Sequence, residues 1–270
     1  MLNYIRAEIY KLLHRPYTYI TLGIMLVLEG LYASMFAFHN SHSLVTPFGG
    51  AVATLVEMGS IGFCICLITG DIVFAAQYKN STLKNEVSFG LSRTQIYLGK
   101  LLAQTLLSLA YLVVMMAFFI GLCAVCLPMN GPAGFYSSQD ALIIVGYFLA
   151  AGIPLWIGGQ AAVCMCQFLV NGEMASSFLY VGVVFVLDTT LEVAGLLSQG
   201  WFGNVLVKIS GYFPNTMLNN AKSVVGDLVY LGQAWLVGAF WLAACTAVGL
   251  YAFHKKEIKY WASARPGATA

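Results

Sequence analysis

Charged residues are scarce in this chain. Only 9% of its 270 residues are Asp, Glu, Lys or Arg, whereas a soluble domain carries roughly 25%. The apolar fraction is 60%, which leaves too little polar surface to cover a water-soluble core of this size. The shortage of charge therefore excludes a soluble globular protein, and we expect the solvent around most of the chain to be lipid.

Motifs that carry chemistry are also missing. The sequence has no G-x-x-x-x-G-K-[ST] loop to cradle a nucleotide phosphate and no H-E-x-x-H metal motif. Cys123 and Cys126 have C-x-x-C spacing, but no histidine or second cysteine pair accompanies them, so a zinc site is not supported. No basic motif supports nucleic-acid binding. The residues therefore indicate no metal, no nucleic-acid partner and no enzyme activity.

The chain does contain six long apolar segments. Each has at least about 20 mostly apolar residues, enough to cross a hydrocarbon layer of roughly 30 Å at about 1.5 Å per residue. Backbone amides in lipid must bond within their own segment, so these segments predict transmembrane helices. The predicted spans are 17–38, 51–76, 101–127, 141–170, 174–197 and 231–253. We therefore predict an all-α fold, one polytopic membrane domain covering residues 1–270 with six transmembrane helices.

The basic residues predict the orientation of these spans. Three of the 13 Lys and Arg precede the first span, four lie between the second and third, and four follow the sixth, which leaves only Lys208 and Lys222 for the other side. Because cytoplasmic loops retain Lys and Arg, both termini are predicted to be cytoplasmic. The same distribution suits contact with anionic lipid head groups.

The residues before the first span predict an amphipathic helix that lies in the inner membrane interface. Glu8 can pair with Lys11 on this helix. A frayed basic terminus is the alternative. The apolar residues that share one helical face are Leu2, Ile5, Ile9, Leu12 and Leu13.

The loop at 77–100, between the second and third spans, predicts a further short helix. Ser81 or Asn80 can cap its start, and Gly90 can end it. Ser92 and Gln95 have the spacing of a capping box that begins the next helix. The helix is polar but carries apolar residues suited to a groove on a partner; a solvated connector is the alternative.

This loop resembles the Glu-Tyr-Lys-x-Gly-Thr-x-Lys-Asn … Ser-Arg … Lys pattern of type-2 ABC exporter permeases, which are membrane subunits of ATP-driven transporters whose ATPase is a separate chain. Gln77 replaces the usual Glu, and Ser81 replaces the usual Gly. The order of an interfacial helix, six spans and a longer outer loop before the last span is similar too. The matching residues are Thr82, Lys84, Asn85, Ser92, Arg93 and Lys100.

The resemblance implies that this loop is a coupling helix that docks on the ATPase. The residues expected to make this contact are Ser81, Thr82, Leu83, Lys84, Asn85, Glu86, Val87, Phe89 and Arg93.

The outer loop at 198–230 is too apolar to be a free aqueous loop and too broken by Gly and Pro to span a membrane. It predicts short helices that dip into the outer leaflet, with a folded extracellular cap as the alternative. By resemblance, re-entrant helices at this place act as an outer gate. The expected gate residues are Trp201, Phe202, Tyr212, Phe213 and Pro214.

Five acidic residues lie inside the predicted spans, and no Lys or Arg lies inside a predicted span to pair with them. Asp71 falls near the inner end, and the other four fall in the outer half. Such residues are costly in hydrocarbon and should face the protein interior or water. Our hypothesis is that the outer four line a path for a cationic or amphipathic substrate; the alternative is that they are protonated or bonded to hydroxyl groups on neighbouring helices. The four are Glu29, Glu57, Asp188 and Glu192.

The resemblance also implies an assembly. The chain would form half of an export pathway in a bacterial plasma (inner) membrane, with a second permease, identical or related, and two cytoplasmic ABC ATPase subunits. ATP and Mg would bind to those ATPases, and this chain would hold no cofactor. The cargo is expected to be a cationic or amphipathic peptide or drug. Two alternatives stay open: a proton-coupled secondary transporter that uses the intramembrane carboxylates, which would need discontinuous helices or inverted repeats, and a membrane scaffold or sensor that transports nothing.

Overall fold

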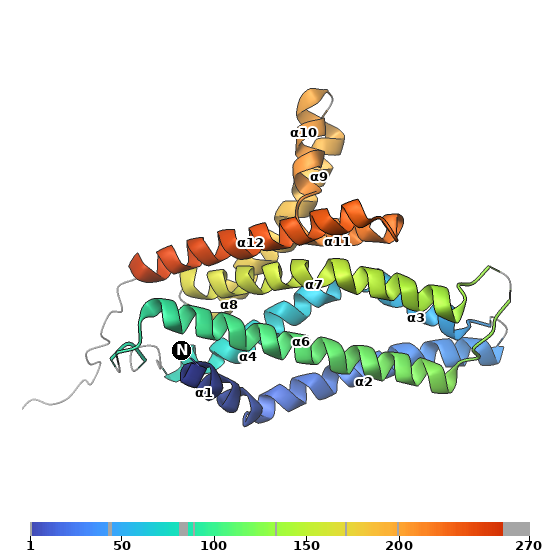
Figure 1. Ribbon diagram of the computed structural model, residues 1–270, viewed down its shortest axis with the longest axis horizontal. Helices are drawn as coiled ribbons and strands as arrows, with labels where there is room; N and C mark the ends of the chain where they lie inside the picture. The colour runs from blue at the N-terminus through green and yellow to red at the C-terminus, as the bar shows by residue number, and fades with distance from the viewer. Residues whose placement is uncertain are drawn as a thin grey trace, which may run out of the picture.

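A computed structural model describes residues 2–42, 45–80, 86–88, 90–132, 134–170, 172–198 and 200–255 (Figure 1). Within these ranges the chain forms helices and no strand. The helices are α1 (Leu2–Leu13), α2 (Pro16–His42), α3 (Phe48–Glu57), α4 (Ile61–Asn80), α6 (Arg93–Cys126), α7 (Ser138–Leu169), α8 (Glu173–Val181), the π-helix η1 (Gly182–Val186), α9 (Leu187–Leu197), α10 (Trp201–Ser210), α11 (Pro214–Asn220), the 3₁₀-helix η2 (Ala221–Val224) and α12 (Leu228–Lys255).

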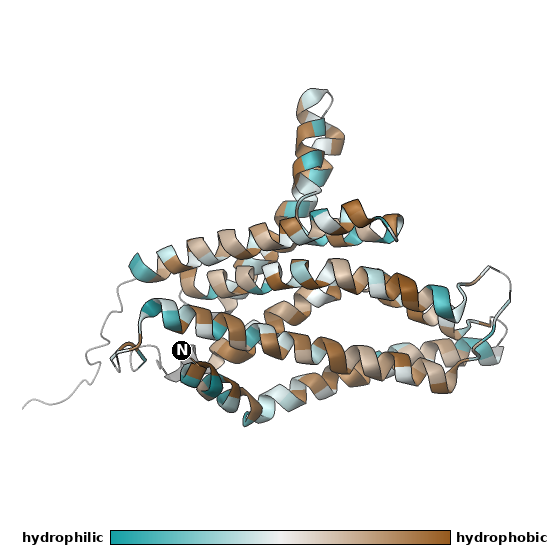
Figure 2. Cartoon of the chain, in the orientation of Figure 1, coloured by the Kyte–Doolittle hydropathy of each residue, from teal (hydrophilic) through white to brown (hydrophobic). Residues whose placement is uncertain are grey.

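The prediction of an all-α membrane protein is confirmed. Among the described residues, five helices are long and apolar enough to cross a membrane, and a sixth span is counted if α3 and α4 are taken together. Apolar residues cover the long helices of the bundle, and polar residues gather toward the helix ends (Figure 2). Each apolar run that the sequence predicts as a span is helical over most of its length.

The prediction of one continuous second span over 51–76 is wrong. The segment is bent by 62° between α3 and α4. Three successive amides at the bend donate to the carbonyl three residues back, for example Ile61 N to Met58 O at 2.9 Å, and this tighter winding replaces the α-helical pattern. Gly59 lies at the bend, where an added Cβ would sit 2.1 Å from Phe148 Cζ of α7. A side chain at position 59 would push the ring of Phe148 aside, so Gly59 lets the bend pack closely against α7.

The helix α12 packs along α7, the most buried helix of the bundle (Figure 1). A Cβ added at Gly238 of α12 would lie 2.4 Å from the carbonyl oxygen of Pro154 in α7. Gly158 and Gly159 of α7 face Trp241 and Phe63 respectively. Gly158, Gly159 and Gly238 therefore bring helices of this chain together, and the space beside them is filled by the chain itself.

The fifth predicted span is divided between two directions. It runs through α8, continues through the π-helix η1 and ends as α9, which leaves the bundle and stands out from it together with α10 (Figure 1). Gly200, with φ of +90°, reverses the chain between the two helices. A Cβ added at Gly203 would lie 2.0 Å from Ser198 O, and one added at Gly195 would lie 2.7 Å from Val207 Cγ2. The α9–α10 hairpin is therefore tightly packed on itself.

The predicted short helices after the fifth span are confirmed as α10 and α11. Pro214 stands at the start of α11, where its missing N–H is no loss. The chain then passes through η2 into α12.

Candidate functional site

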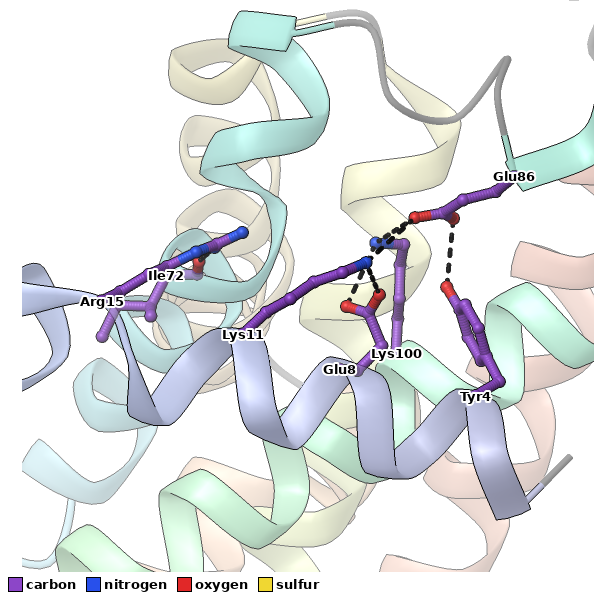
Figure 3. A network of polar contacts seen from close by, with 7 residues as sticks. All are labelled: Tyr4, Glu8, Lys11, Arg15, Ile72, Glu86 and Lys100. Carbon is purple, nitrogen blue, oxygen red and sulfur yellow. Dashed lines mark hydrogen bonds and ion pairs between the residues drawn. The ribbon is translucent and has the colours of Figure 1, made fainter.

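The helix α1, the helical turn 86–88 and the first turns of α6 meet at one end of the bundle (Figure 1; Figure 3). The predicted N-terminal amphipathic helix is confirmed as α1. Its face toward the bundle consists of Tyr4, Glu8 and Leu12, which are buried at a spacing of four residues. Leu2 and Leu13, at its two ends, are more than half exposed, so part of its apolar surface is free to face lipid.

The contact between α1 and α6 depends on a glycine. A Cβ added at Gly99 of α6 would lie 2.5 Å from the ring of Tyr4. At the other end of α1, Arg15 Nη1 donates to the carbonyl oxygen of Ile72 in α4 at 2.7 Å (Figure 3). The helix α1 is therefore attached to two helices of the bundle by side chains at both of its ends.

Two acids and two lysines form an ion cluster at this junction (Figure 3). Glu8 Oε1 lies 2.6 Å from Lys11 Nζ, as the sequence predicts, and Glu8 Oε2 lies 3.7 Å from Lys100 Nζ. Glu86 Oε1 lies 3.8 Å from Lys100 Nζ and 3.9 Å from Lys11 Nζ. Glu86 Oε2 accepts a hydrogen bond of 3.0 Å from the hydroxyl of Tyr4. The cluster therefore joins three segments that are far apart in the sequence.

Burial decides which members of this ion cluster matter most. The side chains of Lys100, Glu8 and Glu86 are only 3%, 4% and 11% exposed, whereas that of Lys11 is 47% exposed. Burying one charge without a partner costs several kcal/mol, roughly 3–5 when a pair is broken. Lys100 Nζ also lies 5.4 Å from the centre of the Phe74 ring, a cation–π contact. Lys100 is therefore the central cation of the cluster.

Lys100 also corrects the sequence analysis. The capping box of Ser92 and Gln95 correctly predicts a helix that begins at Arg93. The sequence analysis, however, counted Lys100 in the loop before the third span, whereas its side chain is buried inside the bundle. Counting apolar residues places the start of the span where the polar residues end. Such a count does not detect a lysine that is buried in the bundle and neutralised by carboxylates. The spacing of Tyr4 and Glu8, one turn apart on α1, was the available signal for the cluster, and the sequence analysis missed it.

The charge states of Tyr4 and Glu8, on the buried face of α1, follow from this environment. Burial, and then the carboxylates of Glu8 and Glu86, raises the pKa of Tyr4 far above its ordinary value. Tyr4 therefore stays protonated, and its hydroxyl donates a hydrogen bond to Glu86. Burial also acts to raise the pKa of Glu8, but the ammonium groups of Lys100 and Lys11 outweigh it and hold that pKa below its ordinary 4.5. Glu8 is therefore ionised in the folded chain.

The lowered pKa of Glu8 predicts an acid-sensitive junction. A group whose pKa is depressed by folding stabilises the fold above its unfolded-state pKa, and this contribution is lost as the pH falls through the folded-state value. We expect the melting temperature of the purified chain to drop below about pH 4.5, the ordinary value for this group, more steeply than that of a Glu8→Gln variant. Parallel melting curves for the two proteins from pH 7 to pH 3 would contradict this assignment.

The end of the predicted coupling helix is confirmed at Gly90. The amide of Gly90 donates to Val87 O at 3.0 Å, the amide of Leu91 donates to Glu86 O at 3.4 Å, and Gly90 has φ of +82°. This pattern is a Schellman motif. The predicted capping box of Ser92 and Gln95 at the start of α6 is also present. The remaining expected contact residues, Ser81, Thr82, Leu83, Lys84, Asn85 and Phe89, lie outside the described part of the chain.

Arg93, which the resemblance assigns to the ATPase contact, has partners inside this chain. Its Nη1 donates to the carbonyl oxygens of Phe253 and His254 at 2.6 and 2.7 Å. These carbonyls lie in the last turn of α12, where a cation is favoured by the helix dipole. Arg93 therefore ties the start of α6 to the end of α12.

The four acids of the expected substrate path do not converge. Glu57 pairs with Lys222 of η2 at 2.7 Å, a partner from the outer loop that the sequence analysis did not foresee. Asp188 is buried and accepts hydrogen bonds from Thr216 at 2.5 Å and Asn215 at 3.3 Å. Glu192, one turn further along α9, is exposed, and Glu29 lines a cavity between α2, α4, α6 and α7. Each acid therefore has an environment of its own.

Asp71, the fifth acid, lies in α4 and accepts hydrogen bonds from Gln167 of α7 at 2.7 Å and from Ser177 of α8 at 3.3 Å. It is therefore held by amide and hydroxyl groups of neighbouring helices.

The expected gate residues fall into two places. Trp201 and Phe202 follow the turn of the α9–α10 hairpin and are exposed. Phe213 lies beside α12, with its ring 5.3 Å from that of Trp241, and Trp241 Nε1 donates to the carbonyl oxygen of Tyr212 at 3.2 Å. Pro214, the next residue in the chain, is buried. The hairpin pair and the pair beside α12 are therefore separate groups.

Residues of this chain match a known protein family. The family model described as ABC-2 family transporter protein matches residues 4–163. This range includes α1, the turn 86–88 and all four members of the ion cluster, and it ends within α7. A search of curated proteins found no match.

Proposed function

Since this chain belongs to the ABC-2 family of transporter proteins, we propose that it is the membrane-spanning permease subunit of an ATP-driven exporter and that the segment around Glu86 couples it to a separate ATPase. Family membership and the apolar helices support a membrane permease. The ATPase contact, the cargo and the direction of transport are the parts that we propose.

The observation that carries the coupling proposal is the way in which the turn 86–88 is held. Its inward residue, Glu86, is buried in the ion cluster with Lys100 of α6 and Tyr4 of α1, whereas Ser88 is exposed on the same turn. A partner that presses on the exposed side acts on a segment that is anchored by charge to two helices. A displacement of the turn 86–88 would therefore move α1 and α6, whereas a solvated connector would bend without moving the helices.

The same junction offers a route to the last helix. The Schellman motif at Gly90 and the capping box at Ser92 join the turn directly to the start of α6. Arg93 then binds the terminal carbonyls of α12. We infer that movement of the turn shifts α1, α6 and α12 together, in the manner of a rigid-body transition between two states.

The proposed assembly has two permeases, identical or related, and two cytoplasmic ABC ATPases that bind ATP and Mg. In it this chain needs no cofactor of its own, and hydrolysis takes place in the partner chain. The excess of basic residues around the second loop and the two termini supports a bacterial inner-membrane orientation with both termini cytoplasmic. The cargo proposed from the intramembrane acids is a cationic or amphipathic peptide or drug.

One observation favours the second candidate, a proton-coupled secondary transporter. The second span is discontinuous, with a 62° bend between α3 and α4, and discontinuous helices are common in such transporters. The two functions differ in their energy source. Transport that continues in vesicles with a collapsed proton gradient, and that stops without ATP, supports the exporter and excludes the proton-coupled candidate.

The coupling proposal predicts that Ser88→Arg abolishes association with the cognate ATPase. The substitution places a large cation on the exposed side of the turn and leaves the buried side unchanged, so we expect at least about a tenfold loss of co-purified ATPase. Gln139→Arg is the matched control, because Gln139 is exposed at the start of α7. The helix α7 starts at the end of the bundle opposite to α1 (Figure 1). Thermal melting of both variants would separate a loss of binding from a loss of folding. Equal co-purification with both variants would remove the turn from the contact.

A further inference from the structure

A cavity of about 440 Å³ lies between α2, the α3–α4 bend, α6 and α7. Its volume falls within the roughly 300–1,000 Å³ of known ligand sites. Leu55, Ile65 and Leu112 are typical of its lining, which is almost entirely apolar. The cavity opens on one side, where the side chains of Leu28 and Ile61 are exposed.

The cavity has one charged residue in its lining. Glu29 of α2 lines it, and Glu29 Oε2 is buried without a hydrogen-bond partner among the described residues. No Lys, Arg or His of the described chain lines the cavity. A buried carboxylate oxygen left without a partner costs free energy that a bound donor or cation would recover. Of the four acids proposed for a substrate path, Glu29 alone therefore combines a cavity with an unused acceptor.

Two further features suit this cavity to ligands of varied shape. Methionine side chains adapt their conformation to irregular surfaces, and four of them occur in the lining. Met58 and Gly59 of the lining belong to the α3–α4 bend, so a change in the bend would change the shape of the cavity. The four methionines are Met25, Met58, Met115 and Met116.

We propose that this cavity binds a lipophilic monocation, an apolar body of drug size with one positive charge, and that Glu29 pairs with that charge. An anion would meet the carboxylate as a like charge, and a neutral apolar molecule would leave Glu29 without a partner. The proposal narrows the cargo class of the proposed function, and only the step from ligand to cargo rests on that function. The binding itself requires neither ATP nor an ATPase.

The test uses the purified full chain in phosphatidylcholine nanodiscs and radiolabelled tetraphenylphosphonium, a lipophilic monocation. We expect saturable binding that is about ten to a hundred times weaker in Glu29→Gln, which keeps the shape of the side chain and removes its charge. Asp140→Asn is the matched control, because it removes an exposed acid from the first turn of α7, outside the lining of the cavity, and should leave binding unchanged. Tetraphenylborate, an anion of the same shape, should not compete.

A second variant tests the location. Met116→Trp places a larger apolar side chain in the lining, and we expect it to weaken binding of the cation without a change in melting temperature. The proposal is overturned if Glu29→Gln binds as tightly as the unmodified chain, if Asp140→Asn loses binding equally, or if Met116→Trp binds normally. If lipid fills the cavity, the cation cannot reach Glu29, and Glu29→Gln and the unmodified chain would bind it equally, which is the first of these results. Because no ATPase is present, failure here leaves the co-purification result for Ser88→Arg unaffected.

Discussion

Replacing Lys100 with methionine is expected to lower the free energy of unfolding by about 3–5 kcal/mol, because it leaves the carboxylates of Glu8 and Glu86 in a buried site without their central cation. Methionine has a similar length and good helix propensity, so the change removes the charge and little else. The effect should be visible as a large fall in the melting temperature of the purified chain and as faster proteolysis near α1.

Lys11→Met is the matched control for this experiment. Lys11 contacts the same two carboxylates, but its side chain is 47% exposed, so water replaces much of the lost interaction and the cost should be at most about 1 kcal/mol. Adding Glu8→Gln to Lys100→Met should restore part of the stability, because one of the unpaired charges is removed. Equal effects of the two lysine substitutions would show that burial does not control the cluster.

Gly238→Ala is expected to have the second-largest effect. The new Cβ would lie 2.4 Å from Pro154 O, a backbone atom of α7 that cannot rotate away, so α12 must move outward from α7. Overpacking of this kind costs about 1–3 kcal/mol, and here it acts on the contact between two long helices of the bundle. Thermal unfolding and the accessibility of Cys245 to a thiol reagent would measure the loss of packing.

Gly232→Ala in the same helix should change stability in the opposite direction. A Cβ added at Gly232 meets no atom within 4 Å, and alanine is favoured over glycine in a helix interior by about 0.5–1 kcal/mol. The pair thus separates a general effect of glycine replacement from the specific α7–α12 contact. A loss of stability in both variants, of similar size, would contradict the packing argument.

The sequence predicts local features of this fold well. Apolar runs locate the helices because lipid requires each span to satisfy its own backbone. The capping box at Ser92 and the helix end at Gly90 depend on residues within one turn of each other, and both are present. The pair of Glu8 and Lys11, three residues apart, is present for the same reason.

Features that depend on contacts between segments far apart in the chain could not be predicted from the sequence. The bend after α3 arises where Gly59 meets Phe148, and no count of apolar residues contains that pair. The ion cluster joins Tyr4, Glu86 and Lys100 across three segments, and Lys100 reads as a loop residue until its neighbours are known. The cavity at Glu29 likewise requires four helices to be placed before it exists.

The α9–α10 hairpin has a consequence for how this architecture can diversify. Its two helices close on each other through Gly195 and Gly203, and Asp188 fastens its base to α11. Because the rest of the hairpin stands clear of the bundle (Figure 1), we expect substitutions beyond that base to leave the packing of the long helices unchanged. We expect insertions, deletions and grafted loops to be tolerated at the tip of the hairpin. The tip is therefore suited to the attachment of reporters, and the hairpin can change in length during evolution.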